Sequence, residues 1–210
     1  MDISYLPSII SLAGLFLVGL ISPGPDFAII VKNSLVHSRK AGLYTAFGLA
    51  LGTLIHVTYS LLGLGFVIAK SSWLLLCVKY LGASYLIYIG YKNLKAQKEK
   101  MMPQHTDHGP QISNFAALKM GFLTSALNPK IILFFVSMFS VVVSSTTPKL
   151  ILVIYGGVIF IETLAWFSFV AFCLSGERMR KKFISIRHWI ERVTGFILII
   201  LGIKLLFHNL

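Results

Sequence analysis

The sequence contains few charged residues. Asp, Glu, Lys and Arg together make up 12% of its 210 residues, whereas they make up about 25% of an average soluble domain. Hydrophobic residues make up 56%, and the mean hydropathy is +0.82. This composition excludes an ordinary soluble domain and predicts an integral membrane protein.

Cysteine is also scarce, and the common catalytic and nucleotide-binding motifs are missing. Cys77 and Cys173 both lie in apolar runs, and no cysteine or histidine cluster has the spacing of metal ligands. We therefore expect neither a disulfide framework nor a metal site, and no cofactor. The sequence has no Walker A motif, no GxSxG and no HExxH. Any uphill transport by this chain would therefore be driven by an ion gradient rather than by ATP.

Acidic residues number only 7, against 19 lysines and arginines, which gives a net charge of +12. Such an excess can indicate nucleic-acid binding. Here most basic residues fall in short segments between apolar runs, which is the distribution found in the cytoplasmic loops of membrane proteins. The predicted partner is therefore the lipid bilayer and not a nucleic acid.

Several apolar segments are long enough to span a bilayer, which takes about 20 residues. They run over residues 6–31, 42–69, 72–91, 115–143, 149–175 and 188–207. We expect an all-α integral membrane protein of six transmembrane helices that forms one domain over residues 1–210. The polar linker 93–114 divides this domain into two halves, at about 1–92 and 115–210.

Lysines and arginines are distributed unevenly among the loops. The segments after the first, third and fifth apolar runs contain most of them: Lys32, Arg39, Lys40, Lys92, Lys95, Lys98, Lys100, Lys119, Arg178, Arg180, Lys181, Lys182, Arg187 and Arg192. The alternate loops contain only Lys70 and Lys149. Because positively charged loops stay in the cytoplasm, we expect a cytoplasmic linker and both termini outside. The N-terminus carries Asp2 and no basic segment, so we interpret its apolar run as a retained helix.

The first and fourth apolar segments are interrupted at corresponding places. Residues 22–27 (SPGPDF) interrupt the first, and residues 128–130 (NPK) interrupt the fourth. His56 and Glu162 follow the two breaks at similar distances, and the ends of the third and sixth segments also resemble each other. These matches predict an inverted three-plus-three repeat. Interrupted helices at corresponding positions of such a repeat indicate a transport site.

The first break combines two prolines, a glycine and a carboxylate. Backbone breaks at membrane depth are tolerated only where protein or a water-filled cavity satisfies the freed groups. After Pro23, Gly24 permits a close approach or an unusual backbone angle, and Pro25 suits the first position of a new half-helix. Asp26 falls in the first turn, where the helix dipole favours an anion. Asp26 either belongs to a functional site or only caps a kinked helix.

The second break has the opposite charge. Asn128 is suited to be an N-cap, Pro129 to be the first helical residue, and Lys130 adds a cation. An anionic group of a ligand would fit this half-helix end. The alternative is that Lys130 extends to the membrane interface.

Three further residues are candidates for the same site. Glu162 lies in the middle of an apolar segment, so it must face a cavity or a partner, or remain protonated. His56 is either a proton relay or a hydrogen-bonded contact between helices. Trp166 lies one turn from Glu162, and it either lines the same cavity or is an ordinary membrane aromatic. Gly48 and Gly52 form a small-xxx-small pair, which favours close helix packing.

Four stretches together resemble the LysE/RhtB family of bacterial amino-acid exporters. They are SPGPDFAIIVKNSL, AGLYTAFGLALG, GASYLIYIGYKNLK and LNPKIILFF, and residues 162–167 resemble the threonine-exporter branch. The resemblance covers nearly the whole chain. It implies export of amino acids, such as threonine, homoserine or a similar neutral amino acid, across the inner membrane by a secondary mechanism. It also implies that the transport site contains Pro23, Gly24, Pro25, Asp26, Asn128, Pro129 and Lys130.

The residues and the resemblance lead to one hypothesis with two rivals. In a proton-coupled antiporter, a substrate carboxylate would bind at residues 128–130 and its ammonium group at Asp26, Glu162 or both, while a proton competes for these carboxylates. The first rival is a membrane-embedded enzyme that uses Asp26 and Glu162 as an acid–base pair. The second is a small-ion transporter or channel. The glycine faces would permit a homodimer.

Overall fold

The computed structural model describes residues 5–22, 24–70, 72–96, 111–143, 147–174 and 177–207. Within these ranges the regular structure is entirely helical, so the predicted all-α fold is confirmed. The elements are α1 (Leu6–Ile21), α2 (Pro25–Lys32), the π-helical turn η2 (Asn33–His37), α3 (Arg39–Lys70), α4 (Ser72–Leu94), α5 (Asn114–Ala126), α6 (Pro129–Val142), α7 (Lys149–Leu174) and α8 (Glu177–Phe207). Most of the linker predicted at 93–114 lies outside the described residues.

Both predicted helix breaks are present. Pro25 and Pro129 are the first residues of α2 and α6, as expected for a residue that lacks the amide hydrogen left free at a helix start. The α1–α2 pair is bent by 62° and the α5–α6 pair by 55°. Pro23 lies outside the described residues.

Two to four membrane spans can be identified by length and composition in the described part of the chain. The α3 and α7 helices are each long and apolar enough to cross a membrane, and each bent pair meets the same test when it is counted as one span. A helix suits this environment because it satisfies its own backbone hydrogen bonds. The predicted count of six spans remains a prediction.

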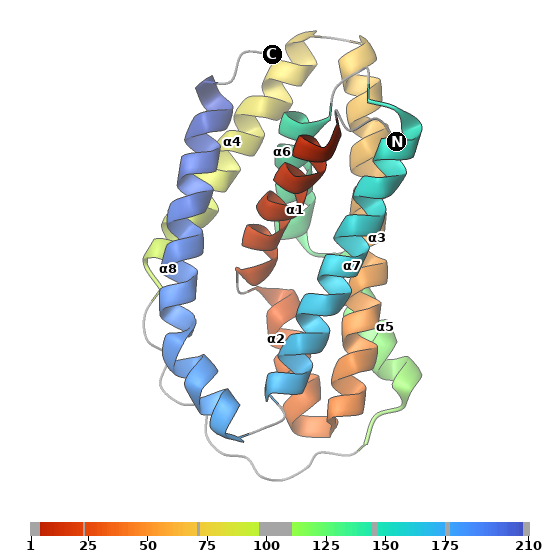
Figure 1. The fold of residues 1–210 in the computed structure, drawn as a ribbon, viewed down its shortest axis with the longest axis vertical. Helices are drawn as coiled ribbons and strands as arrows, with labels where there is room; N and C mark the ends of the chain where they lie inside the picture. Colours follow the sequence, from red (N-terminus) through yellow and green to blue (C-terminus); the bar gives the residue numbers. More distant parts are fainter. Residues whose placement is uncertain are drawn as a thin grey trace.

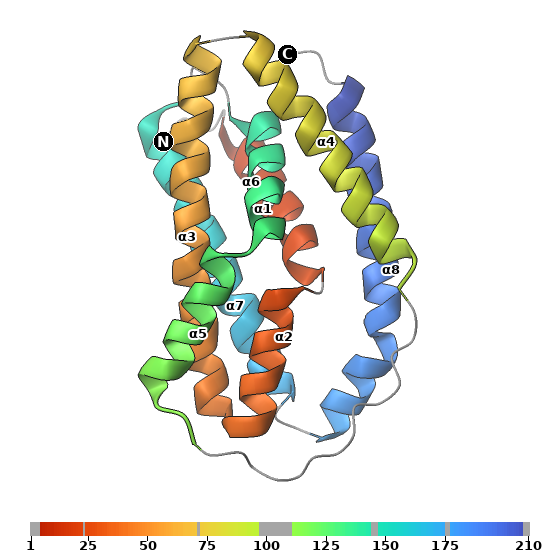
Figure 2. The same cartoon turned by 180° about the vertical axis from the view of Figure 1, so that it is seen from behind.

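The two broken pairs run in opposite directions through the molecule. Figures 1 and 2 show α1 beside α6 toward one end, and α2 and α5 toward the other. The starts of α2 and α6 therefore face each other near the middle. The start of α1 and the end of α8 lie at the same end of the molecule, whereas the turn between η2 and α3 and the start of α8 lie at the opposite end (Figure 1).

The glycines of α3 form the predicted close-packing face, and their partner is α5. A Cβ on Gly48 would overlap the carbonyl oxygen of Leu118, and one on Gly52 would lie 2.7 Å from the carbonyl oxygen of Phe122. The reciprocal contact is made by Gly121, where a Cβ would overlap the carbonyl oxygen of Thr45. Because only glycine fits at such distances, these residues bring α3 and α5 into backbone contact.

A second glycine contact joins α4 and α8, which lie side by side in both views (Figures 1 and 2). A Cβ on Gly90 would lie 2.6 Å from the carbonyl oxygen of Gly195, and the reciprocal distance is also 2.6 Å. The α8 helix begins at Glu177, well before the apolar run predicted at 188–207. The basic segment before that run continues the helix because lysine, arginine and glutamate are good helix formers.

Two apolar clusters pack around the break region. The first contains Phe16 of α1, Phe135 and Phe139 of α6, and Tyr155 of α7. The second joins α2, α3 and α7, with Phe27 among its members, and its other fully or largely buried residues are Ile30, Ala46, Leu49, Phe167, Val170 and Ala171. The breaks lie between these clusters, so their polar groups have apolar surroundings.

Candidate functional site

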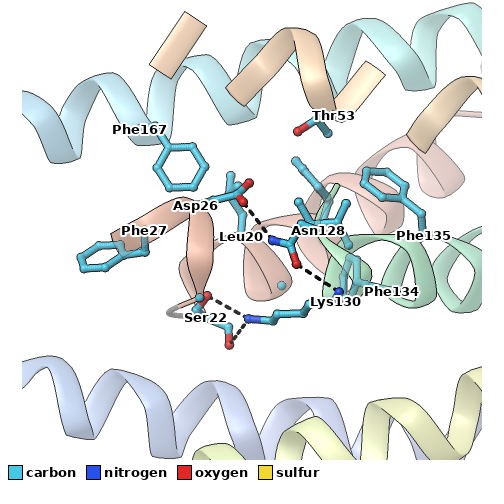
Figure 3. A pocket seen from close by; sticks show the side chains of 14 residues that line it. Leu20, Ser22, Asp26, Phe27, Thr53, Asn128, Lys130, Phe134, Phe135 and Phe167 are labelled. Carbon is cyan, nitrogen blue, oxygen red and sulfur yellow. Dashed lines mark hydrogen bonds between the residues drawn. The ribbon is translucent and has the colours of Figure 1, made fainter. Parts of the chain in front are cut away.

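The starts of α2 and α6 are joined by the side chain of Asn128. Its Oδ1 accepts a hydrogen bond from the backbone N–H of Lys130 over 3.0 Å, which confirms the predicted N-cap. Its Nδ2 donates to Oδ1 of Asp26 over 2.9 Å (Figure 3). Asp26 is in the first turn of α2, whose N-cap residue is Gly24. The carboxylate therefore links the two breaks through Asn128.

The ammonium group of Lys130 is directed at the end of α1. Its Nζ donates to the carbonyl oxygen of Ser22 over 3.1 Å and to the Ser22 hydroxyl over 2.9 Å (Figure 3). Ser22 is the C-cap of α1, where the helix dipole favours a cation. The Ser22 hydroxyl also accepts a hydrogen bond of 2.7 Å from Nδ2 of Asn93, near the end of α4. The three residues thus join α1, α4 and α6.

A cavity of about 50 Å³ lies between these groups. By the same measure one water molecule needs about 10–15 Å³, so the cavity has room for a few waters. Its lining residues are Phe16, Gly19, Leu20, Ser22, Gly24, Asp26, Phe27, Thr53, Asn128, Lys130, Ile131, Phe134, Phe135 and Phe167. Charges of both signs are therefore enclosed by a largely aromatic wall.

Behind this wall, His56 fixes the end of α5. Its ring is fully buried, and its Nε2 lies 2.7 Å from the carbonyl oxygen of Ser125. A carbonyl can only accept, so Nε2 carries the hydrogen, and Nδ1 is left to accept from the hydroxyl of Tyr59. The ring also stacks on Phe135, with centroids 6.2 Å apart and planes 9° apart. The predicted helix–helix contact is therefore present.

The hydroxyl groups of Thr53 and Ser125 extend the polar groups of the cavity toward His56. They lie 3.1 Å apart, and Thr53 also donates to the carbonyl oxygen of Leu49 over 2.9 Å. Thr53 lines the cavity, whereas Ser125 belongs to the last turns of α5 and is fully buried. The site therefore contains groups from α1, α2, α3, α5 and α6.

The family model described as LysE type translocator matches residues 17–209. The chain belongs to this family. Among its relatives are the threonine efflux proteins of Salmonella typhi and Escherichia coli strain K12. Each is 30% identical to this chain, over 93% and 94% of it respectively and 96% of the relative's own length. The uncharacterized membrane protein YrhP of Bacillus subtilis is 32% identical over 88% of this chain and 91% of its own.

The comparison with solved structures finds no match. The resemblance noted from the motifs is confirmed at the level of the family. The chain is accordingly a multi-pass translocator of the bacterial inner membrane that acts on a small molecule, and it is not an enzyme.

Four of the predicted site residues line one cavity in this translocator. They are Gly24, Asp26, Asn128 and Lys130. The residues predicted for the cation side and the anion side thus line a single cavity. The expectation of an unusual backbone angle at Gly24 is wrong, because its φ of −167° is extended and open to any residue. A Cβ there would lie 3.5 Å from Nζ of Lys130, which is an ordinary contact.

The predicted residues of α7 lie elsewhere. Neither Glu162 nor Trp166 is among the residues that line the cavity, although the neighbouring Phe167 is. Oε2 of Glu162 and Nε1 of Trp166 are both buried without a hydrogen-bond partner among the described residues. They are thus two unsatisfied polar groups one helical turn apart. Within the described ranges no three His, Cys, Asp or Glu side chains form a possible metal site.

Sequence reasoning missed several polar members of the translocator's site. Ser22 belongs to the first motif but received no role, and Asn93 ends an apolar segment within the GYKNLK stretch. Thr53 and Ser125 carry no distinctive signal, because hydroxyl residues are frequent at contacts between membrane helices. The position of Ser22 at a helix end facing Lys130 is a tertiary feature, so only the structure reveals it.

Proposed function

We propose that this translocator exports a small neutral amino acid, such as threonine or homoserine, from the cytoplasm. The observation that carries the proposal is the juxtaposition of Asp26 and Lys130 in one cavity, at the starts of α2 and α6. A zwitterion has one anionic and one cationic group, and the cavity contains a side chain of each opposite charge. The printed names of two relatives, threonine efflux protein, support the same substrate class.

When the substrate binds, Lys130 and Asp26 exchange their hydrogen-bond partners within the protein for groups of the substrate. Lys130 already donates to Ser22, and Asp26 already accepts from Asn128. A substrate carboxylate replaces Ser22 at the ammonium group of Lys130, and a substrate ammonium replaces the amide of Asn128 at Asp26. Because each buried charge keeps a partner throughout, the exchange avoids the cost of an unpaired charge in apolar surroundings.

The carboxylate of Asp26 would also couple transport to protons. A proton that reaches Asp26 from outside competes with the substrate ammonium group, and its arrival releases the substrate outward. Because Asp26 lines the cavity and Glu162 does not, we assign the proton to Asp26. Glu162 remains a candidate for coupling from α7.

The proposed architecture is an inverted repeat of two three-helix halves with a cytoplasmic linker and six spans. The two bent pairs, which run in opposite directions, support it. The start of α1 and the end of α8 lie at one end, which we assign to the outside. Rocking of one half against the other would alternate access. The homodimer hypothesis relied on glycine faces, but Gly48, Gly52, Gly90 and Gly195 pack within the chain, so they lend it no support.

Counterflow in proteoliposomes tests the proposal. Vesicles that contain the purified protein are loaded with unlabelled threonine and diluted into trace labelled threonine. If the protein is an exporter, labelled threonine accumulates transiently inside the vesicles and is recovered chemically unchanged. A channel gives no counterflow, and chemically altered label would indicate an enzyme. If neither threonine nor any other amino acid shows counterflow above that of protein-free vesicles, the proposed function is wrong.

A further inference from the structure

We infer that the contact between Phe134 and Gly19 sets the length of the amino-acid side chain that the translocator accepts. The inference rests on the proposed function and adds the element that selects among amino acids. Phe134 belongs to α6 and Gly19 to α1, and both line the cavity. Phe134 is only 9% exposed.

The apolar lining of the cavity is concentrated where α1 and α6 meet. This wall consists of Phe16, Gly19, Leu20, Ile131, Phe134 and Phe135. Phe134 and Phe135 meet edge to face, with ring centroids 6.3 Å apart. Figure 3 shows these two rings on one side of Asn128 and Lys130, with Phe27 and Phe167 on the other side of the polar groups. The α1–α6 wall is therefore the continuous apolar surface beside Lys130.

The ring of Phe134 reaches the backbone of α1 at Gly19. A Cβ at Gly19 would overlap the tip of this ring, and it would lie 2.9 Å from the third-nearest ring atom, Cε1. The ring of Phe134 can therefore occupy this position only because residue 19 has no side chain. The ring in turn occupies volume that would otherwise extend the cavity between the two helices.

The spacing along α6 relates this ring to the bound substrate. Lys130 and Phe134 are four residues apart and lie on the same face of the helix, about 6 Å apart along its axis. A substrate whose carboxylate lies at Lys130 therefore directs its side chain about one turn along α6, toward the ring. The cavity of about 50 Å³ leaves little space beyond a short side chain. The ring of Phe134 is the end of the side-chain pocket.

The test compares threonine with leucine and alanine as counterflow substrates. Phe134→Leu and Phe134→Ala lengthen the pocket, so transport of leucine relative to threonine rises at least about tenfold, the range for one methylene in an apolar pocket. Gly19→Ala displaces the ring toward the substrate and shifts the preference from threonine to alanine. Combining Gly19→Ala with Phe134→Leu restores the preference for threonine, because the added methyl group gains space where the ring was.

The matched control is Phe139→Ala. Phe139 belongs to the same helix and is fully buried, but it does not line the cavity. Phe139→Ala removes the same number of atoms from α6 as Phe134→Ala does, so it shows the effect of looser helix packing alone. We expect the ratio of leucine to threonine transport to stay at the wild-type value. Phe134→Leu keeps a large apolar side chain and Gly19→Ala adds one methyl group, so these two variants test the inference if Phe134→Ala does not yield folded protein.

The outcomes separate the inference from the proposed function. If the wild type shows threonine counterflow but the leucine-to-threonine ratio is unchanged in the Phe134 variants, the inference is overturned and the proposed function stands. A shift of equal size in Phe139→Ala also overturns it, since the effect would not be local. If the wild type moves no amino acid, the proposed function fails and the inference fails with it.

Discussion

The side-chain amide of Asn128 donates a hydrogen bond of 2.9 Å to the carboxylate of Asp26, across 102 positions of the sequence. Each residue also belongs to the start of its own half-helix. The bond therefore connects the two breaks and, with them, the two halves of the chain. In the proposed function, stability and transport depend on the same few atoms, which makes the expected consequences of substitution specific.

Asn128→Ala is expected to destabilise the protein by about 1.5–5 kcal/mol. It removes the N-cap of α6, which is worth about 0.5–2 kcal/mol, and it leaves the buried carboxylate of Asp26 without this donor, which costs about 1–3 kcal/mol. Unfolding in detergent, followed by circular dichroism, measures the change. Ser113→Ala is the control, because the exposed side chain of Ser113 caps α5 by accepting from the backbone N–H of Ala116. This substitution should cost about 1 kcal/mol. Equal effects of the two substitutions would contradict the dual role of Asn128.

Lys130→Ala is expected to raise the half-saturating threonine concentration about tenfold or more. A hydrogen bond to a charged group contributes about 1.5–3 kcal/mol, and in the proposed complex the ammonium group binds the substrate carboxylate. Counterflow rates measured over a range of threonine concentrations give the value, with protein per vesicle quantified separately. A variant that loses maximal rate but keeps the same half-saturation would argue against a role in substrate binding.

Ser22→Ala is expected to have the opposite effect. The Ser22 hydroxyl accepts from Lys130 over 2.9 Å and so competes with the substrate carboxylate for the same ammonium group. Its removal should lower the half-saturating concentration about tenfold or more, because a hydrogen bond to a charged group contributes about 1.5–3 kcal/mol. Asn93→Ala provides the comparison, because it removes the other partner of this hydroxyl without touching Lys130. An increase in the half-saturating concentration of Ser22→Ala would indicate that Ser22 itself binds substrate.

The sequence predicted the helices and both breaks because proline in an apolar run leaves few alternatives. Pro25 and Pro129 were expected as first helical residues and Asn128 as an N-cap, and the structure has them there. The partners of the polar groups were not predictable, because they depend on how α1 packs against α6. The sequence leaves open whether Lys130 binds an anionic group of a ligand or extends to the membrane interface, and in the structure its ammonium group binds the end of α1 through Ser22.

Two features could not be predicted from the sequence: which phenylalanines line the cavity, and which surroundings the polar residues of α7 have. The chain has 16 phenylalanines, and an apolar run does not distinguish those that face a cavity from those that face lipid. Glu162 was selected because an acid in the middle of a membrane helix is unusual. That rule locates a buried polar group correctly but does not say which cavity it faces, and Glu162 does not line the one described.

Asp26→Asn is expected to abolish transport driven by a pH gradient and to keep measurable counterflow. The amide retains hydrogen bonding to Asn128 but does not bind and release a proton. Glu162→Gln is expected to keep both activities, because Glu162 is not part of the cavity lining. The measurement compares threonine flux with and without an imposed pH gradient in each variant. If Glu162→Gln alone loses the response to the gradient, the proton-binding residue is on α7; if both variants keep it, the coupling hypothesis is wrong.

His56→Gln is expected to keep proton-driven transport within about twofold of wild type, because glutamine offers a donor to the carbonyl oxygen of Ser125 in place of Nε2–H. His56→Ala removes this donor while the carbonyl still accepts from the N–H of Asn128, so the loss of one hydrogen bond should cost about 0.5–1.5 kcal/mol of stability. The contact matters for transport because Ser125 stands three residues before Asn128, and their backbones are joined by a hydrogen bond of 3.0 Å. Flux with and without a pH gradient, together with unfolding in detergent, tests both variants. A proton relay would instead require a titratable side chain at this position, so loss of gradient-driven flux in a stable His56→Gln protein would favour the relay over the helix contact.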